Sequence, residues 1–171
     1  MRMESKNINL RLVDVEDAEF ILGLRMDENL NRFLSRVEND LNKQIEWIKN
    51  YKLSESLKKE YYFIIEGKNS EKYGTVKVYD LRSDSFCWGS WVVKIGSPAY
   101  VAIESALLTY IFGFNNLGFK KSHFEVRKDN KRVLELHKKF GAQIISEDKL
   151  NFYFSISKNI FLKTYDKNAV G

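Results

Sequence analysis

Residues 126–142 read Val126-Arg127-Lys128-Asp129-Asn130-Lys131-Arg132-Val133-Leu134-Glu135-Leu136-His137-Lys138-Lys139-Phe140-Gly141-Ala142, and this stretch decides the fold. It predicts a strand end followed by a helix, because Asp129 and Asn130 are good N-cap residues and Gly141 suits the position just after a helix. One helix face carries residues at the i, i+3, i+4 and i+7 spacing: Val133, Leu136, His137 and Phe140. His137 is therefore predicted to point inward, among apolar side chains.

The rest of the chain predicts alternating strands and helices. Residues 14–26 form a predicted helix with Ala18, Ile21, Leu22 and Arg25 on successive turns. Further helices are expected over residues 41–51 and 102–117, the latter ending at Gly118. Strands are expected over 8–13, 61–65, 74–79, 86–93, 122–126, 142–146 and 151–157. Residues 165–171 are predicted to be a frayed tail.

Length and composition bound the class of protein. A chain of 171 residues with 44% hydrophobic and 30% charged residues fits one domain over residues 1–171, with a core over 8–162. The first residues carry no apolar run typical of a secretory signal, and the apolar stretch 101–114 is too short to span a membrane, so a cytoplasmic protein without a membrane partner is expected. A single cysteine, Cys87, excludes an internal disulfide, and two histidines without zinc-site spacing give no reason to expect a metal.

The positive charge of the chain is concentrated in one segment. Residues 120–139 hold eight basic and three acidic residues, an excess equal to the net charge of +5 for the whole chain. The basic residues are Lys120, Lys121, Arg127, Lys128, Lys131, Arg132, Lys138 and Lys139. Such a cluster at a helix start suits a polyphosphate ligand, although a merely solvated basic face is an equal alternative. Nucleic acid is not expected, because the aromatic residues follow apolar patterns rather than alternate with the basic ones.

Residues 126–142 closely resemble the fourth helix of the GNAT superfamily of N-acetyltransferases. The predicted order of strands and helices is also similar to that family from Ile8 to Leu162. Leu10-Arg11-Leu12-Val13, Asp17-Ala18, Leu24-Arg25 and Trp91 resemble the branch of ribosomal-protein N-terminal acetyltransferases, whereas residues 27–50 are similar to enzymes that act on nucleotide-linked amino sugars.

The resemblance implies a single α/β domain, with a mixed, mostly antiparallel sheet flanked by helices. It also implies direct transfer of acetyl from acetyl-CoA to a primary amine: an amino sugar, a small metabolite or a peptide N-terminus. The chain is expected to be a monomer or a homodimer. The alternative is a non-catalytic module that binds coenzyme A.

The resemblance further implies a set of cofactor-binding residues. Backbone N–H groups of the loop after strand 86–93 would hold the pyrophosphate at a helix start, where unsatisfied donors and the helix dipole favour anions. The expected cofactor residues are Val92, Val93, Gly96, Ser97, Pro98, Ala99, Tyr100, Val101, Ala102, Asn130 and Arg132. Val92 and Val93 would polarise the thioester carbonyl through their N–H groups, and Asn130 would contact the pantetheine arm. The loop departs from the family pattern, because Tyr100 stands where a glycine is usual and would crowd the phosphates if its φ had to be positive.

Three residues are candidates for proton handling. His137 occupies a position that is usually a tyrosine, from which the ring would assist the departing thiolate; burial would keep the ring neutral, and a neutral ring still donates one hydrogen bond. A core histidine is the alternative. His123 and Glu125 share one strand face, and either would serve as general base, the alternative being a merely polar strand face. Tyr79, Trp88 and Trp91 line an acceptor pocket or belong to the core.

Overall fold

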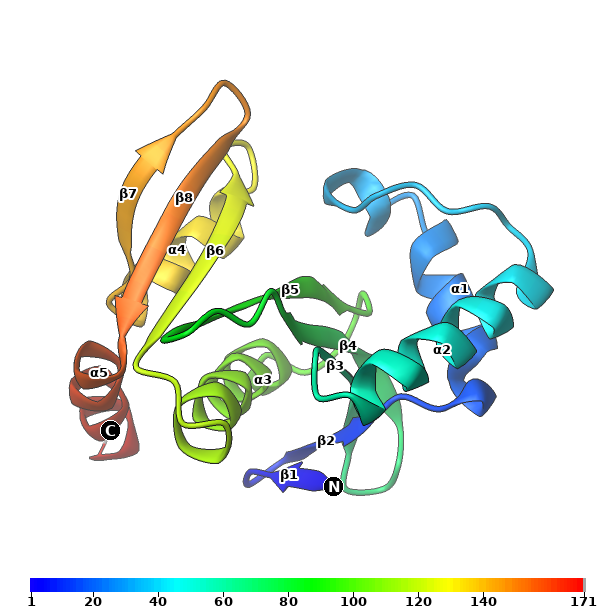
Figure 1. Ribbon diagram of the computed structural model, residues 1–171, viewed down its shortest axis with the longest axis horizontal. Helices are drawn as coiled ribbons and strands as arrows, with labels where there is room; N and C mark the ends of the chain where they lie inside the picture. Colours follow the sequence, from blue (N-terminus) through cyan, green and yellow to red (C-terminus); the bar gives the residue numbers. More distant parts are fainter. Residues whose placement is uncertain (171) are drawn as a thin grey trace.

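The computed structural model describes residues 1–170, with side chains as far as Tyr165, as one mixed sheet with helices on both faces (Figure 1). The strands are β1 (Arg2–Glu4), β2 (Ile8–Leu12), β3 (Tyr61–Gly67), β4 (Lys72–Tyr79), β5 (Ser85–Val93), β6 (Lys121–Arg127), β7 (Gln143–Glu147) and β8 (Asn151–Ser157). The helices are α1 (Ala18–Met26), α2 (Leu41–Ser56), α3 (Tyr100–Ile111), α4 (Lys131–Lys139) and α5 (Lys158–Val170), with shorter turns η1 (Val15–Asp17), η2 (Asn31–Phe33) and η3 (Phe112–Asn116).

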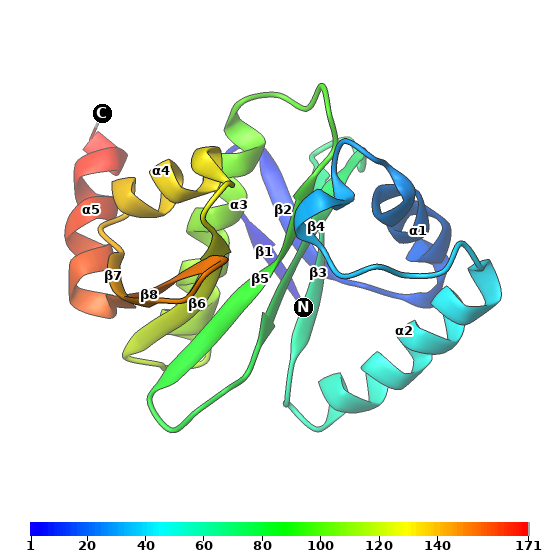
Figure 2. The same ribbon diagram turned by 90° about the horizontal axis from the view of Figure 1, so that it is seen from above.

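The strands follow the order β1-β2-β3-β4-β5-β6-β8-β7 across the sheet. Neighbouring strands are antiparallel except β5 and β6, which are parallel. Helices α1 and α2 cover one face of the half that contains β2, β3 and β4, and α3 lies on the other side (Figure 2). This architecture confirms the fold class predicted from the sequence.

Two apolar clusters stabilise the two sides of the sheet. The smaller one lies under α1 and α2 and includes Ile21, Ile48 and Ile64. The larger one is rich in aromatic rings, where Tyr110 of α3 packs against Phe140 of the α4 end and other rings. Each such buried ring contributes about 1.5–3 kcal/mol relative to an exposed one, so α3, α4 and α5 are held together mainly by this cluster.

A buried ion network fixes the start of α1. The two terminal nitrogens of the Arg11 guanidinium, Nη1 and Nη2, donate to the two Asp17 carboxylate oxygens at 2.9 and 2.8 Å. Nε of Arg11 donates to the Glu66 carboxylate at 3.0 Å. Asp17 also accepts the backbone N–H of Asp14 at 2.8 Å, which completes a capping box. The sequence predicts one helix over 14–26, and the structure divides it into η1 and α1 at this network.

Several elements differ from the sequence prediction. β1 and α5 were not predicted, and α2 continues to Ser56 rather than ending at residue 51. α3 begins at Tyr100, two residues early, and its last turn widens into the π-helical η3. Residues 165–170 of the predicted frayed tail belong to α5, whose Phe161 and Tyr165 join the aromatic cluster, and residue 171 lies outside the described residues. None of the helices in the described residues is long and apolar enough to cross a membrane.

A β-bulge in β5 separates this strand from β6. The β4–β5 register shifts between Thr75 and Lys77, and Ser90 has a φ of +45°. Glycine is required at position 74, because a Cβ there would lie 1.9 Å from the Val92 carbonyl oxygen. β5 and β6 pair only from Ser85 to Cys87, opposite residues 121–123, and then diverge (Figure 1). The divergence opens the sheet at its centre.

Candidate active site

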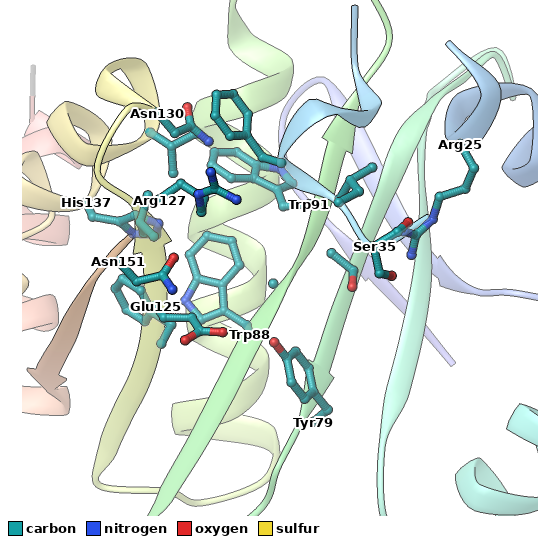
Figure 3. Close-up of a pocket in the computed structure, with 17 residues that line it drawn as sticks. Arg25, Ser35, Tyr79, Trp88, Trp91, Glu125, Arg127, Asn130, His137 and Asn151 are labelled. Atoms are coloured by element: carbon teal, nitrogen blue, oxygen red, sulfur yellow. The ribbon is translucent and has the colours of Figure 1, made fainter. Parts of the chain in front are cut away.

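A cavity of about 540 Å³ lies where β5 and β6 diverge. Residues 88–91 of β5 and 124–127 of β6 form two of its walls, and the start of α4 forms a third (Figure 3). Arg25 of α1 and residues 33–35 close the remaining side. The volume falls within the range typical of small-molecule sites.

His137 is the most deeply buried polar residue of the cavity wall, with 4% of its surface exposed. The rings of Trp88 and Phe124 lie 5.2 and 4.1 Å from the imidazole, centroid to centroid. Burial lowers the pKa of His137 to about 3, because a charged imidazolium loses its hydration there. The ring is therefore neutral at physiological pH, as the inward position predicted from the sequence requires.

The hydroxyl of Tyr110 lies 3.5 Å from Nδ1 of His137, a long hydrogen bond. Burial raises the pKa of Tyr110, so this hydroxyl keeps its proton and is available as a donor. If it donates to Nδ1, the imidazole proton is on Nε2. That tautomer gives the ring one N–H for a ligand in the cavity.

The two ends of α4 explain the positions of His137 and Asn130. At the C-terminal end, the N–H of Ala142 donates to the His137 carbonyl oxygen at 3.1 Å, and the N–H of Gly141 donates to the Lys138 carbonyl oxygen at 3.0 Å. These two hydrogen bonds, with Gly141 at a φ of +95°, form a Schellman motif. At the other end Asn130 is the N-cap residue, as predicted, but its side chain makes no capping hydrogen bond within the described chain. Asn130 lines the cavity instead (Figure 3).

The predicted phosphate loop lies outside this cavity, at the start of α3. Tyr100 is the first residue of that helix, its φ is not positive and its side chain is 37% exposed. The positive φ on which the predicted crowding of the phosphates depends is therefore not found at Tyr100. Gly96 is the residue of this loop with a positive φ, +85°. Val101 is fully buried, and its backbone N–H donates to the Pro98 carbonyl oxygen at 3.1 Å.

Val92, Val93 and Arg132, which were also predicted to bind the cofactor, do not line the cavity. Val92 and Val93 follow the bulge and pair with Thr75 and Gly74 on β4. Arg132 is exposed in the first turn of α4. Of the residues predicted for the cofactor, Asn130 is the one that lines the cavity itself, among the residues that the structure describes.

The structure separates the two candidate bases. Glu125 lines the cavity between β5 and β6, and it also lines a neighbouring cavity of about 340 Å³. His123 lines the smaller cavity only, where its Nε2 lies 2.8 Å from Asp80 and its Nδ1 lies 2.5 Å from the Ser85 hydroxyl. These two partners tie β6 to the β4–β5 hairpin, and the hydrogen bond from His123 holds the pKa of Asp80 below its ordinary value. Glu125 is thus the candidate that faces the larger cavity.

Sequence reasoning missed several lining residues. Arg25, Ser35, Arg127 and Asn151 all border the cavity (Figure 3). A signal existed for Arg25, because it falls on the apolar face of the helix predicted over residues 14–26. Tyr79, Trp88 and Trp91, for which pocket and core were alternatives, line the cavity, and Trp88 is also buried in the core.

Comparisons with known proteins agree with this geometry. The profile of the family described as acetyltransferase (GNAT) domain matches residues 7–143. The solved structure of apo FdhC, described as a nucleotide-linked sugar GNAT, is 44% identical to this chain; the match covers 99% of this chain and 97% of that one, with a TM-score of 0.91. The chain therefore belongs to the GNAT acetyltransferase family, as its resemblance indicated.

More distant structures share the fold. Ribosomal-protein-S5-alanine acetyltransferase from Vibrio fischeri is 13% identical, with a TM-score of 0.81, and the match covers 93% of this chain and 97% of that one. A spermidine N-acetyltransferase variant from Vibrio cholerae is 14% identical, with a TM-score of 0.74 and coverage of 92% and 98%. No curated protein matches the sequence.

Proposed function

We propose that this protein transfers an acetyl group from acetyl-CoA directly to the amino group of a nucleotide-linked amino sugar. The observation that carries the proposal is the 44% identity, over nearly the whole chain, with a nucleotide-linked sugar GNAT. The likeness to the ribosomal-protein and spermidine enzymes is at 13–14% identity and supports the fold alone. Among the acceptors that the sequence left open, the amino sugar is therefore preferred.

The cofactor is proposed to enter between β5 and β6. Asn130 would bind the pantetheine arm, since its side-chain amide faces the cavity and is not used as a helix cap. The loop over residues 94–102 would hold the pyrophosphate at the start of α3, where helix N–H groups favour anions, and basic residues such as Arg132 would add to the attraction. Backbone N–H groups of Val92 and Val93 would polarise the thioester carbonyl.

Two side chains are proposed to handle protons. The acceptor ammonium must lose a proton before its nitrogen attacks the thioester carbon, and Glu125 offers a carboxylate in the cavity to receive it. As the carbon–sulfur bond breaks, the electron pair goes to sulfur, and the Nε2–H of His137 would stabilise the thiolate by a hydrogen bond. A neutral ring with a pKa of about 3 acts as a hydrogen-bond donor and not as an imidazolium acid. The attacking nitrogen must release a second proton to become an amide, and this proton passes through water to the thiolate, which leaves as the thiol of coenzyme A.

An acceptor screen tests the proposal. Purified protein with acetyl-CoA is offered nucleotide-linked amino sugars, the corresponding free amino sugars, polyamines and peptides with free N-termini, and release of the coenzyme A thiol is measured. We expect turnover with a nucleotide-linked amino sugar and much slower turnover with the other amines. Preferred turnover of a peptide or a polyamine would contradict the proposed acceptor.

The same screen tests the alternative of a binding module. A ligand at about 100 times its dissociation constant stabilises a folded protein by about 2.7 kcal/mol, so coenzyme A binding is detected as a rise in melting temperature. Such a rise without turnover of any amine would favour the module. No rise and no turnover would refute both functions.

A further inference from the structure

Two arginine side chains enter the cavity from opposite walls, Arg25 from α1 and Arg127 from the end of β6 (Figure 3). Nε of Arg127 is buried and has no hydrogen-bond partner among the described residues; the nearest carboxylate, that of Asp129, lies 3.8 Å away. Arg25 donates to the backbone carbonyl of Ser35 at 3.3 Å. The Arg127 side chain as a whole is 39% exposed, so its guanidinium remains accessible to an acceptor from a ligand in the cavity.

The charge of the cavity favours an anion. Of the lining residues in the described chain, Arg25 and Arg127 carry positive charge and Glu125 carries negative charge, while His137 is neutral. A polyamine would bring several positive charges close to the two guanidinium groups, which is unfavourable in a partly buried site. A ligand that carries negative charge next to its amine fits better.

We propose that Arg25 and Arg127 form a subsite that binds the diphosphate of the nucleotide-linked acceptor, an inference that rests on the function proposed above. In such an acceptor one sugar ring separates the amine from the diphosphate, so both groups have to fit within the same cavity. The planar guanidinium binds two phosphate oxygens at once, and the diphosphate offers acceptors on both sides. The amine is then directed to the part of the cavity that Glu125 and His137 line.

The subsite is distinct from the place proposed for the pyrophosphate of coenzyme A. That pyrophosphate is assigned to the loop at the start of α3, none of whose residues 94–102 lines this cavity within the described chain. Loss of either arginine should therefore weaken binding of the acceptor without weakening binding of acetyl-CoA.

Calorimetric titration with UDP and dTDP tests the subsite directly, because these nucleoside diphosphates lack the sugar and the amine. Protein saturated with coenzyme A is titrated as wild type, Arg25→Gln, Arg127→Gln and Arg36→Gln. Arg36→Gln is the matched control, since Arg36 is exposed, adjoins the 33–35 segment and does not line the cavity. We expect at least one nucleoside diphosphate to bind the wild type and the control equally, and each cavity variant about tenfold or more weaker, the loss typical of a charged hydrogen bond.

The Arg→Lys variants and the affinity for coenzyme A distinguish a loss of diphosphate binding from a loss of folding. Arg25→Lys and Arg127→Lys retain the charge but not the planar fork, so intermediate affinity is expected, with coenzyme A affinity unchanged in every variant. Equal affinity of wild type and both Gln variants for each nucleoside diphosphate, or equal loss of coenzyme A affinity, would overturn the subsite. No binding of either nucleoside diphosphate to the wild type would also overturn it.

The two proposals fail in different ways. Arginine-dependent binding of a nucleoside diphosphate, without turnover of any nucleotide-linked amino sugar, would support the subsite and refute the proposed function. Turnover of such a sugar with an unchanged KM for the acceptor in Arg25→Gln and Arg127→Gln would refute the subsite and leave the function standing.

Discussion

Nδ1 of His137 lies 3.5 Å from the hydroxyl of Tyr110, so a neutral imidazole on α4 is oriented by a phenol on α3. Both groups are buried, and burial keeps each of them uncharged because it lowers the pKa of His137 to about 3 and raises that of Tyr110. The contact links the aromatic core to the wall of the cavity. It therefore couples the packing of α3 against α4 to the orientation of one N–H in the proposed active site.

Replacing His137 should lower turnover through the loss of that N–H. His137→Phe retains an aromatic ring of similar shape but has no donor, and we expect turnover to fall by roughly 10²-fold, with coenzyme A affinity little changed. His137→Tyr restores a donor and should recover much of the loss. Steady-state kinetics on the acceptor found in the screen measure both variants, and unchanged turnover in His137→Phe would make His137 a core residue only.

His137 should also make the protein acid-sensitive. Its folded pKa of about 3 lies below the ordinary value of 6.5, so between these values the unfolded chain binds a proton that the folded protein does not. The free energy of unfolding should then decrease as pH falls below about 6.5, with a slope of up to about 1.4 kcal/mol per pH unit from this group. Urea titrations from pH 7 to 4 should show a shallower decrease for His137→Phe, and identical slopes would contradict the assignment.

Tyr100→Gly tests the phosphate loop. The residue has a helical backbone and begins α3, so a glycine gives the backbone no conformation that it needs there and costs about 1 kcal/mol of helix stability. We expect acetyl-CoA binding to be unchanged or weaker. Tyr100→Ala is the control for loss of the ring alone, and calorimetry at two salt concentrations should show weaker binding at the higher one if basic residues hold the pyrophosphate. Tighter binding in Tyr100→Gly would show that the tyrosine crowds the phosphates.

Replacement by alanine should have opposite effects on stability at two glycines, Gly141 and Gly23. Gly141 has a φ of +95°, and a Cβ there would lie 2.6 Å from Ile160 of α5, so Gly141→Ala should destabilise the protein by about 1 kcal/mol or more. Gly23 lies within α1 with no atom within 4 Å of an added Cβ, so Gly23→Ala should stabilise by roughly 0.5–1 kcal/mol. Melting temperatures compare the two, and a loss of stability in both variants would refute the distinction.

The elements with strong local signals were predicted well. The helix between Asn130 and Gly141 is α4, with its N-cap and its glycine where expected, because caps and apolar spacing are properties of nearby residues. α5 was missed because Phe161 packs against Tyr110 of α3 and Tyr165 stacks on Phe161, and a contact with a distant helix is not visible in a local pattern. The extension of α2 beyond residue 51 likewise involves contacts distant in sequence, such as the hydrogen bond from Lys52 to the Val13 carbonyl at 3.1 Å.

The candidate site divides in the same way. His137 and Asn130 were identified from one segment of sequence, and the structure places both on the cavity wall. His123 and Glu125 were equivalent in the sequence, since both lie on one strand face two residues apart. Only the tertiary structure shows that His123 is within hydrogen-bond distance of Asp80 and Ser85 of the β4–β5 hairpin, whereas Glu125 faces the larger cavity.

The sequence by itself determined the inward position of His137 and the ends of α4, because these depend on apolar periodicity and on capping within a few residues. The family fold followed from the resemblance of the sequence to the GNAT superfamily. The tertiary structure decided what surrounds the ring of His137, that β5 and β6 diverge after three paired positions, and that Arg25 and Arg127 border one cavity although they are far apart in the chain. Those properties depend on a bulge in β5 and on the packing of α1 beside the sheet. Pairing across a sheet joins distant residues, and no spacing within one segment encodes the distance between them.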